Sequence, residues 1–372
     1  MPVARVHRIA AAAPDDTSGI EAAIAAGHID PGGILAVFGK TEGNGCVNDF
    51  SRGFAAKSLE LMLRRHIGAA ASEVCLVMSG GTEGGMSPHF LVLERMEAGE
   101  GAGPALAIGR VHTADLPAEQ LGRLGQVEQV AQAVRAAMAQ ASITRPQDVH
   151  FVQVKCPLLT LARIAEAKAR GADTATADTL KSMGLSRGAS ALGIAVALGE
   201  IDSAQLSDAA VCADLSLWSG RASCSSGIEL MGHEVVVLGM AEAWSGPLAI
   251  EHAVMRDAID VAPVRAALLR AGLDADALAA GDGEGPADGQ GEGLVALLAK
   301  AEASRSGLIR GRRHTMLDDS DISSTRHARA FVAGALAGLV GCTDIYVSGG
   351  AEHQGPDGGG PAAVIVRRRA SA

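Results

Sequence analysis

The segment "VMSGGTEG" at residues 77–84 returns near the other end of the chain as "VSGGAEHQGP" at residues 347–356. Each copy joins the end of an apolar run to a serine, to glycines and, shortly afterwards, to a glutamate. A surface loop has no reason to recur so far along a chain, whereas self-similar segments are the signature of repeated structural units. The pair therefore raises the question of whether the chain holds further copies.

A wider search finds one order of features three times: an apolar run with a lysine, an arginine at the start of an Ala-rich helical pattern, a Ser-Gly pair, and a returning β-rich run. The lysines are Lys40, Lys155 and Lys300, the arginines are Arg52, Arg187 and Arg326, and the pairs are Ser79-Gly80, Ser226-Gly227 and Ser348-Gly349. The distances between these features vary from copy to copy, which is typical of a constant framework with variable loops.

The repeat predicts three related units, at residues 1–100, 103–244 and 246–372. The Gly- and Asp-rich segment 281–293 is then a flexible excursion inside the third unit. The run "GLVALLAKAEAS" at 293–304 looks helical by composition, but its counterparts in the other two copies read as strands. We therefore predict a strand there, on the basis of the repeat and against propensity.

The predicted fold class is α/β, with three similar units placed with pseudo-threefold symmetry around one central active site. Equivalent strand ends would then bring three lysines, three arginines and three serines to one pocket. Arginine offers fixed donors to planar oxygen acceptors, and a glycine after serine lets the backbone approach a ligand closely. This donor set matches a small planar molecule with three equivalent carbonyl groups.

A serine needs a base to become a nucleophile, and no Ser-His-Asp arrangement is visible in the sequence. A neutral lysine can serve instead, and burial and nearby cations lower a lysine pKa. Lys40 and Lys300 are each followed two residues later by a glutamate, whereas Lys155 has no acidic residue nearby in the sequence. The sequence therefore predicts that Lys155, lacking its own counter-ion, activates Ser226.

Composition excludes several classes of protein. The formal net charge of −10 and the pI near 5.6 argue against a nucleic-acid partner. No apolar run reaches the length of a membrane span, and the N-terminal stretch "MPVARVHRIAAAAPDD" lacks the uninterrupted apolar segment of a secretory signal. Six cysteines without a CxxC pair, and histidines without a metal-binding motif, favour a reduced cytoplasmic protein and disfavour a zinc hydrolase.

Longer stretches together resemble the cyanuric acid hydrolase/barbiturase family of ring-opening amidohydrolases, closest to its cyanuric acid branch, along essentially the whole chain. They are "GKTEGNGCVNDFSR", "MSGGTEGGMSPH", "HFVQVKCPLLT", "SMGLSRGASALGIA", "AKAEAS", "RHTMLDDSDISSTRHARA" and "VSGGAEHQGPDGGGP". The resemblance implies three equivalent domains around one site, in a homo-oligomer that is often a tetramer. It also implies hydrolysis of the s-triazine ring of cyanuric acid to carboxybiuret, which loses CO2 to give biuret.

The resemblance further implies roles for individual residues. Ser226 would be the nucleophile and Lys155 its activator. The substrate would be bound by Arg52, Ser79, Gly80, Arg187, Ser226, Gly227, Arg326, Ser348, Gly349, Lys40 and Lys300. Catalysis itself would need no cofactor. A structural Mg2+ or Ca2+ in the third unit would be held by Glu302, Ala351, Gln354, Gly355, Pro356 and Gly359.

Other functions stay open at this point. Barbituric acid, which is opened to ureidomalonate, differs from cyanuric acid where one ring has N–H and the other CH2, and Ile322 and Ser323 are candidates for telling them apart. A non-catalytic protein that binds planar anions could use the same donors without turnover. A zinc hydrolase would instead be sensitive to chelators.

Overall fold

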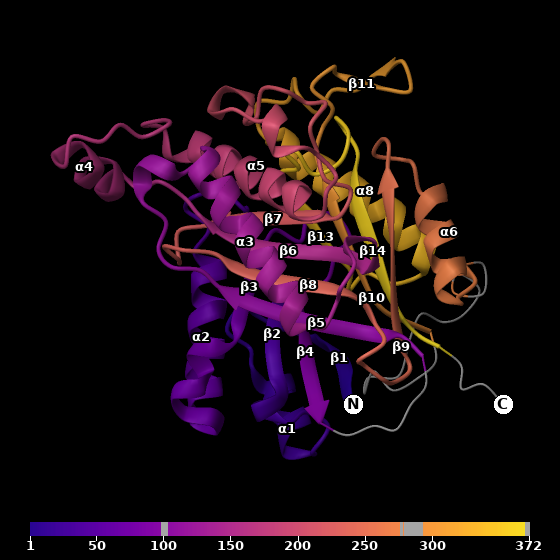
Figure 1. The fold of residues 1–372 in the computed structure, drawn as a ribbon. Helices are drawn as coiled ribbons and strands as arrows, with labels where there is room; N and C mark the ends of the chain where they lie inside the picture. Colours follow the sequence, from indigo (N-terminus) through magenta and orange to yellow (C-terminus); the bar gives the residue numbers. More distant parts are fainter. Residues whose placement is uncertain (98–102, 276–277, 279–292, 369–372) are drawn as a thin grey trace.

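The structure is a computed structural model that describes residues 1–97, 103–275, 278 and 293–368. Within these residues lie three four-stranded sheets (Figure 1). The first contains β1 (Pro2–Ala10), β2 (Ile34–Thr41), β3 (Cys75–Gly80) and β4 (His89–Glu97). The second contains β5 (Ala105–His112), β6 (Val149–Pro157), β7 (Ala222–Gly227) and β8 (Glu234–Ala241). The third contains β9 (Leu248–Met255), β10 (Gly293–Ala301), β13 (Tyr346–Gly349) and β14 (Gly360–Arg367).

The three sheets share one topology. Their strand orders are β1-β4-β2-β3, β5-β8-β6-β7 and β9-β14-β10-β13, so each unit places its fourth strand between its first and its second. In every sheet the second and third strands run parallel, and the other neighbours are antiparallel. One topology repeated along one chain confirms the predicted mixed α/β architecture of similar units.

Two helices pack on each sheet in the same way. They are α1 (Ser18–Ala25) and α2 (Phe50–Ile67), α3 (Leu124–Gln140) and α5 (Thr179–Ala197), and α6 (Ala262–Ala271) and α8 (Ser324–Val340). The first helix of each pair contacts the first strand, and the second helix contacts the second or third strand. The second unit adds α4 (Leu161–Ala169), and a short hairpin, β11 (Leu308–Ile309) with β12 (Arg312–Arg313), precedes α8.

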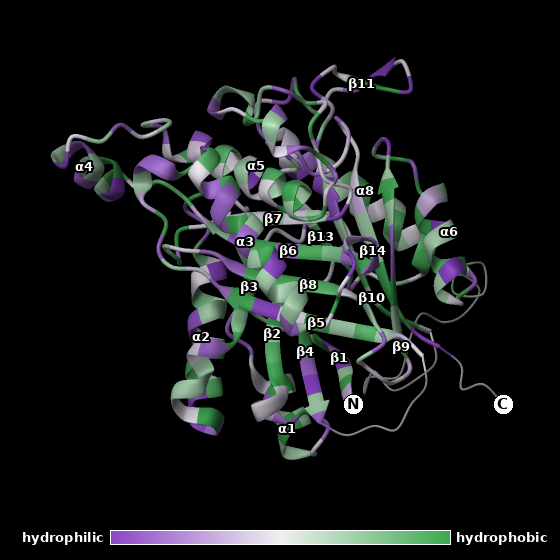
Figure 2. Ribbon diagram, in the orientation of Figure 1, coloured by the Kyte–Doolittle hydropathy of each residue, from purple (hydrophilic) through white to green (hydrophobic). Residues whose placement is uncertain are grey.

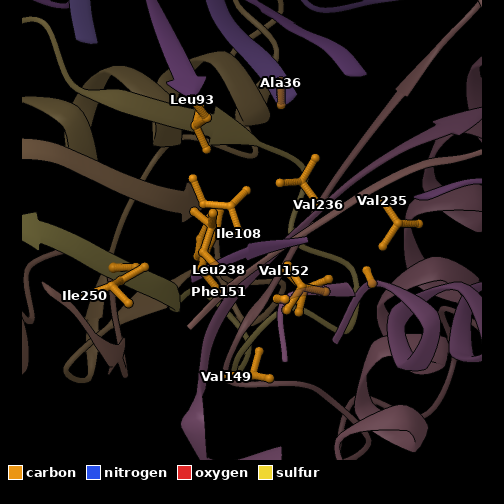
Figure 3. Packing of buried hydrophobic residues seen from close by; sticks show 14 of the residues in the cluster. Ala36, Leu93, Ile108, Val149, Phe151, Val152, Val235, Val236, Leu238 and Ile250 are labelled. Atoms are coloured by element: carbon orange, nitrogen blue, oxygen red, sulfur yellow. The ribbon is translucent and has the colours of Figure 1, made fainter. Parts of the chain in front are cut away.

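Apolar side chains from all three sheets meet in one interior. Figure 3 shows Ala36 and Leu93 of the first sheet close to Ile108 of the second, with Ile250 of the third nearby, and all four belong to one buried cluster. Strands such as β2 and β8 are hydrophobic along most of their length, whereas β4 ends in hydrophilic residues (Figure 2). Strands buried on both faces read as continuous apolar runs, which explains runs such as that of β8. The sheets therefore pack on one another inside and on helices outside.

The run at 293–304 is a strand, as the repeat predicted. Its residues form β10, which pairs with β13 on one side and with β14 on the other. Tertiary pairing overrides the helical preference of Leu and Ala at this position. The segment 281–293 lies outside the described residues apart from Gly293. No helix in the described part of the chain is long and apolar enough to cross a membrane.

Candidate active site

The parallel strand pairs bring each lysine beside a serine. In the first sheet Lys40 is in register with Ser79, and in the third Lys300 is in register with Ser348. Lys40 Nζ donates a hydrogen bond to Ser79 Oγ at 3.3 Å, and Lys300 Nζ donates one to Ser348 Oγ at 2.8 Å. These lysines and serines are buried, so the two Lys–Ser contacts are shielded from water.

In the second sheet, the serine that lies beside the lysine is one residue earlier in the chain than the sequence-based alignment predicted. Lys155 is in register with Ser225, whereas Ser226 is in register with Cys156. Residues in register on adjacent parallel strands point to the same side of the sheet, so Ser225 is the counterpart of the serines in the other two sheets. The predicted equivalence of Ser226 with them is therefore wrong. Ser226 instead occupies the strand position that is glycine in both other units, and its Oγ accepts a hydrogen bond from Arg187 Nη1 at 3.3 Å.

The lysines also link the sheets to one another. Each donates to the backbone carbonyl that precedes the serine of a different sheet. The three bonds are Lys40 to Val347 at 2.9 Å, Lys155 to Met78 at 2.7 Å and Lys300 to Cys224 at 2.9 Å. The first sheet is thus joined to the third, the second to the first and the third to the second. This closed ring of contacts places all three lysines around one centre.

A narrow cavity lies at this centre. It is lined by Gly45, Arg52, Ser79, Gly80, Met183, Arg187, Ser225, Ser226, Arg329 and Gly349. A wider cavity adjoins it and shares Gly45, Met183, Arg187, Arg329 and Gly349. Some of the residues predicted from sequence to bind substrate are not part of its lining: Lys40, Lys300, Gly227, Arg326 and Ser348. Lys40 donates to Ser79, which does line it.

The third arginine that lines the cavity is Arg329. The prediction that Arg326 occupies this position is wrong. The Arg329 side chain is 3% exposed and lines the cavity, whereas the Arg326 side chain is 37% exposed. Both arginines begin α8, three residues apart on the chain. Both lie at the start of the same Ala-rich helical pattern, and the sequence pattern alone selected the first of them.

Two glutamates that the sequence reasoning missed hold two of the arginines. Arg329 Nε and Nη2 donate to Glu83 at 2.7 and 2.5 Å. Arg187 Nε and Nη2 donate to Glu352 at 2.8 and 2.6 Å. Such two-point pairs fix the guanidinium plane as well as its charge. The sequence does mark these two glutamates, because each stands four residues after the serine of its unit.

Lys155 has a carboxylate partner that the sequence analysis did not predict. Glu229 Oε1 lies 2.7 Å from Lys155 Nζ, so the expectation that this lysine lacks a carboxylate is wrong. In the described part of the chain it is Lys40 and Lys300 that have no carboxylate within ion-pair distance. The glutamates that follow them turn elsewhere: Glu42 is exposed, and Glu302 accepts from Thr325 and the Ala303 amide.

All three lysine pKa values are lowered, for different reasons. Burial and then the charge of Arg329 hold the pKa of Lys40 well below its ordinary value. Burial and then the charge of Arg187 lower the pKa of Lys300 to about 7. Burial also lowers the pKa of Lys155, but the adjacent Glu229 opposes that shift. A neutral amine is therefore accessible in this site near neutral pH.

A further cavity, which shares Arg305, Thr325 and Glu352 with the wider one, is lined by the predicted cation ligands Glu302, Ala351, Gly355 and Pro356. Burial and then Glu352 raise the pKa of Glu302, whose carboxylate accepts hydrogen bonds from the Ala303 amide and the Thr325 hydroxyl. In the described part of the chain this largely buried carboxylate has no cation within ion-pair distance, which fits a bound divalent ion.

The other ligands of such an ion would be backbone carbonyls. The described residues contain no cluster of three or more His, Cys, Asp or Glu side chains suited to a metal. The Gln354 side-chain oxygen already accepts from the Cys224 amide at 2.6 Å, so this residue would offer its main-chain carbonyl. Carbonyl and carboxylate oxygens are the donors that Mg2+ and Ca2+ prefer, and the loop therefore fits the predicted ion.

Comparison with known proteins places this architecture in a family. The family described as amidohydrolase ring-opening protein matches residues 5–367. The cyanuric acid amidohydrolase of Azorhizobium caulinodans is 72% identical over 99% of both chains, and that of a Bradyrhizobium species is 60% identical over 98% of both. A crystal structure of the A. caulinodans hydrolase matches with a TM-score of 0.91 over 100% of both chains.

A second solved structure is a cyanuric acid hydrolase described as an evolutionary innovation by structural concatenation. It is 49% identical in sequence, and it matches with a TM-score of 0.91 over 99% of this chain and 100% of its own. The chain therefore belongs to the ring-opening amidohydrolase family.

Proposed function

We propose that this chain hydrolyses cyanuric acid. Water adds across one ring C–N bond to give carboxybiuret, which then loses CO2 to leave biuret. The observation that carries the proposal is the convergence of Arg52, Arg187 and Arg329, one from each unit, on one cavity. Three forked donors around one centre suit a small ring with three equivalent carbonyl oxygens. Relatives at 72% and 60% identity that are named for this activity support the same reading.

The three units at 1–100, 103–244 and 246–372 are proposed to lie around an approximate threefold axis through this cavity. The shared strand order and the closed ring of lysine-to-carbonyl hydrogen bonds support this arrangement. A threefold arrangement of donors would present the same groups to each edge of the ring. The substrate would then bind equivalently in three orientations, and only one set of residues needs to carry out the chemistry.

We assign the chemistry to the second set. In its neutral form Lys155 accepts the proton of a serine hydroxyl, and the serine oxygen attacks a ring carbonyl carbon. The ring C–N bond then breaks, and the departing nitrogen takes the proton from Lys155. Water hydrolyses the resulting acyl-serine in the second half of the reaction. The register favours Ser225 as this serine, and Ser226 is the alternative from the sequence.

Two single substitutions test this assignment. Ser225→Ala and Ser226→Ala are incubated with cyanuric acid, and biuret and CO2 are measured. We expect Ser225→Ala to lose at least 1,000-fold in kcat, on the order seen when a nucleophile is removed, and Ser226→Ala to stay within about tenfold. The reverse result would make Ser226 the nucleophile. Absence of biuret from the unmodified chain would remove the proposed activity altogether.

Barbituric acid is the control substrate. Ser323 lines the wider cavity next to the site and Ile322 is not part of that lining, so Ser323 is the better placed of the two candidates for selecting the ring. Incubation of the unmodified chain with barbituric acid, followed by detection of ureidomalonate, separates the two activities. Ureidomalonate without biuret would show that the chain is a barbiturase.

The proposal includes a structural divalent cation and a cytoplasmic homotetramer. Mg2+ or Ca2+ would be held by the Glu302 carboxylate and by main-chain oxygens of the loop, for which the candidates are Ala351, Gln354, Gly355, Pro356 and Gly359. When bound, such an ion supplies positive charge beside two buried carboxylates and ties the loop to β10. The reaction steps above use no metal, and the support for the tetramer is the resemblance alone.

A further inference from the structure

The ion pairs of the site follow a rule in two of the three units. Arg329 of the third unit pairs with Glu83 of the first, and Arg187 of the second pairs with Glu352 of the third. In both pairs the arginine Nε donates to a glutamate that follows the repeated strand serine by four residues. By the same rule, an arginine of the first unit should pair with a glutamate of the second.

The third pair does not form. The two residues would be Arg52 and Glu229, but Glu229 lies against Lys155 instead, with Oε1 2.7 Å from Nζ. Arg52 Nε is buried and has no hydrogen-bond partner among the described residues. An unpaired buried N–H is costly, so the absence of Glu229 from this position requires a compensating interaction.

Asp49 supplies that compensation. It stands three residues before Arg52, with Oδ2 3.7 Å from Nε, and is 5% exposed. It also caps α2 by accepting a hydrogen bond from the Ser51 amide at 3.0 Å, which fixes its position. The residues three places before the other two arginines are Gly184 and Arg326, neither of which carries a negative charge.

We propose that Glu229 is a positioning residue for Lys155, and that Asp49 makes this possible by taking the place of Glu229 beside Arg52. The inference rests on the proposed function, in which Lys155 is the base. Lys155 Nζ donates to the Met78 carbonyl at 2.7 Å and contacts Glu229 at 2.7 Å. Two fixed partners leave one direction at the nitrogen for the serine hydroxyl. One of three similar sets is thereby made chemically distinct.

The charged and titratable groups that face Lys155 are Glu229, Arg52 and Cys156. Removal of the Glu229 charge leaves burial and the cationic Arg52, both of which disfavour the protonated amine. A variant without this carboxylate should therefore hold Lys155 neutral down to a lower pH, while its amine is no longer held in one place. A purely structural role for Glu229 would not move the pH dependence.

The test is Glu229→Gln, with Glu83→Gln as the matched control, assayed on cyanuric acid across pH. We expect Glu229→Gln to lower kcat at least tenfold with KM changed less than threefold, and to move the acidic limb of the kcat profile down by about one pH unit. Glu229→Asp should recover part of the rate. Glu83→Gln should raise KM through Arg329 and leave the acidic limb in place.

A direct measurement separates this inference from the proposed function. The chain has only six lysines, so the 13Cε signal of Lys155 can be followed by NMR and assigned with Lys155→Arg. Its titration midpoint should fall in Glu229→Gln whether or not the protein opens cyanuric acid. An unchanged midpoint and an unchanged acidic limb would overturn the inference, as would an equal shift in Glu83→Gln.

Asp49→Asn provides an independent variant, should Glu229→Gln fail to fold. Loss of the Asp49 charge should draw Glu229 toward Arg52 and away from Lys155. We expect the same downward shift of the Lys155 midpoint, smaller than in Glu229→Gln. A midpoint equal to that of the unmodified protein would show that Asp49 does not free Glu229 for Lys155.

Discussion

At the site, the first and third sheets resemble each other more than either resembles the second. In the first and third, the lysine donates to its serine, and the next strand residue is a glycine, Gly80 or Gly349. In the second, the lysine meets a carboxylate, and the residue after Ser225 is Ser226. All three units thus share one backbone arrangement, whereas the side-chain contacts of the lysine are the same in the first and third units and different in the second.

The difference shows how a repeated framework can gain a single reactive set. A Cβ at Gly80 would lie 1.7 Å from Asp49 Oδ2, and a Cβ at Gly349 would lie 2.4 Å from Thr325 Cγ2. In the second unit Gly184 stands three residues before Arg187, where the first unit has Asp49 before Arg52, and the Ser226 side chain is accommodated beside Arg187. Local packing, and not the strand topology, therefore decides where the units diverge. The predictions below test this from the largest expected effect to the smallest.

The arginines should show the strictest equivalence among the units. Arg329→Lys keeps a positive charge but removes the fork that pairs with Glu83 and faces the cavity. We expect kcat/KM for cyanuric acid to fall more than 100-fold, about 3 kcal/mol in transition-state stabilisation. Arg326→Lys is the matched control and should change kcat/KM less than threefold, because that side chain is partly exposed. Similar losses in both variants would contradict the equivalence of Arg329 with Arg52 and Arg187.

The glycine positions should respond differently in the first and second sheets. Gly80→Ala forces the Asp49 carboxylate to move, and Asp49 both caps α2 and accepts from the Gly45 amide at 2.8 Å. We expect the free energy of unfolding to fall by about 2 to 3 kcal/mol, since overpacking and a lost helix cap act together. Ser226→Gly, the reciprocal change, should cost less than about 1 kcal/mol. Urea denaturation of both variants measures the difference, and equal costs would show that Asp49 does not set the local packing.

Much of the framework could be predicted from the sequence because a repeat constrains each copy by the other two. The strand β10 is the clearest case: its composition is helical, but its counterparts are strands, and the structure agrees. The structure also brings the three predicted lysines together, because each stands in an apolar run that cannot be shifted without exposing the strand.

The serine of the second unit was misaligned because its short motif can be aligned in two ways. In "SSGIE" the Ser-Gly pair selects Ser226, whereas the glutamate four residues after each strand serine would have selected Ser225. The partner of Lys155 could not be found in this manner, because Glu229 is remote in the sequence and its counterparts contact arginines. A side chain that changes partner within a repeat leaves no sequence pattern.

The buried histidines extend the comparison to stability. His89 begins β4 and His233 directly precedes β8, whereas Gly359 precedes β14 in the third sheet. Burial lowers the pKa of His89 to about 4 and that of His233 to about 3. His233 Nε2 contacts the Gln126 amide nitrogen at 3.0 Å and Nδ1 contacts Thr113 Oγ1 at 3.2 Å, which suits a neutral ring that accepts at one nitrogen and donates at the other.

The sign of the pH dependence follows from these lowered values. The unfolded chain takes up a proton at His233 below the ordinary pKa of about 6.5, while the folded protein stays neutral there until about pH 3, so stability is lost as pH falls through this window. Between pH 7 and pH 5 this histidine should cost about 2 kcal/mol of unfolding free energy. His233→Gln keeps an amide partner for Gln126 without a titrating ring. Urea denaturation at both pH values should show the unmodified protein losing about 2 kcal/mol more than the variant, and equal losses would mean that the folded protein protonates His233 near its ordinary pKa.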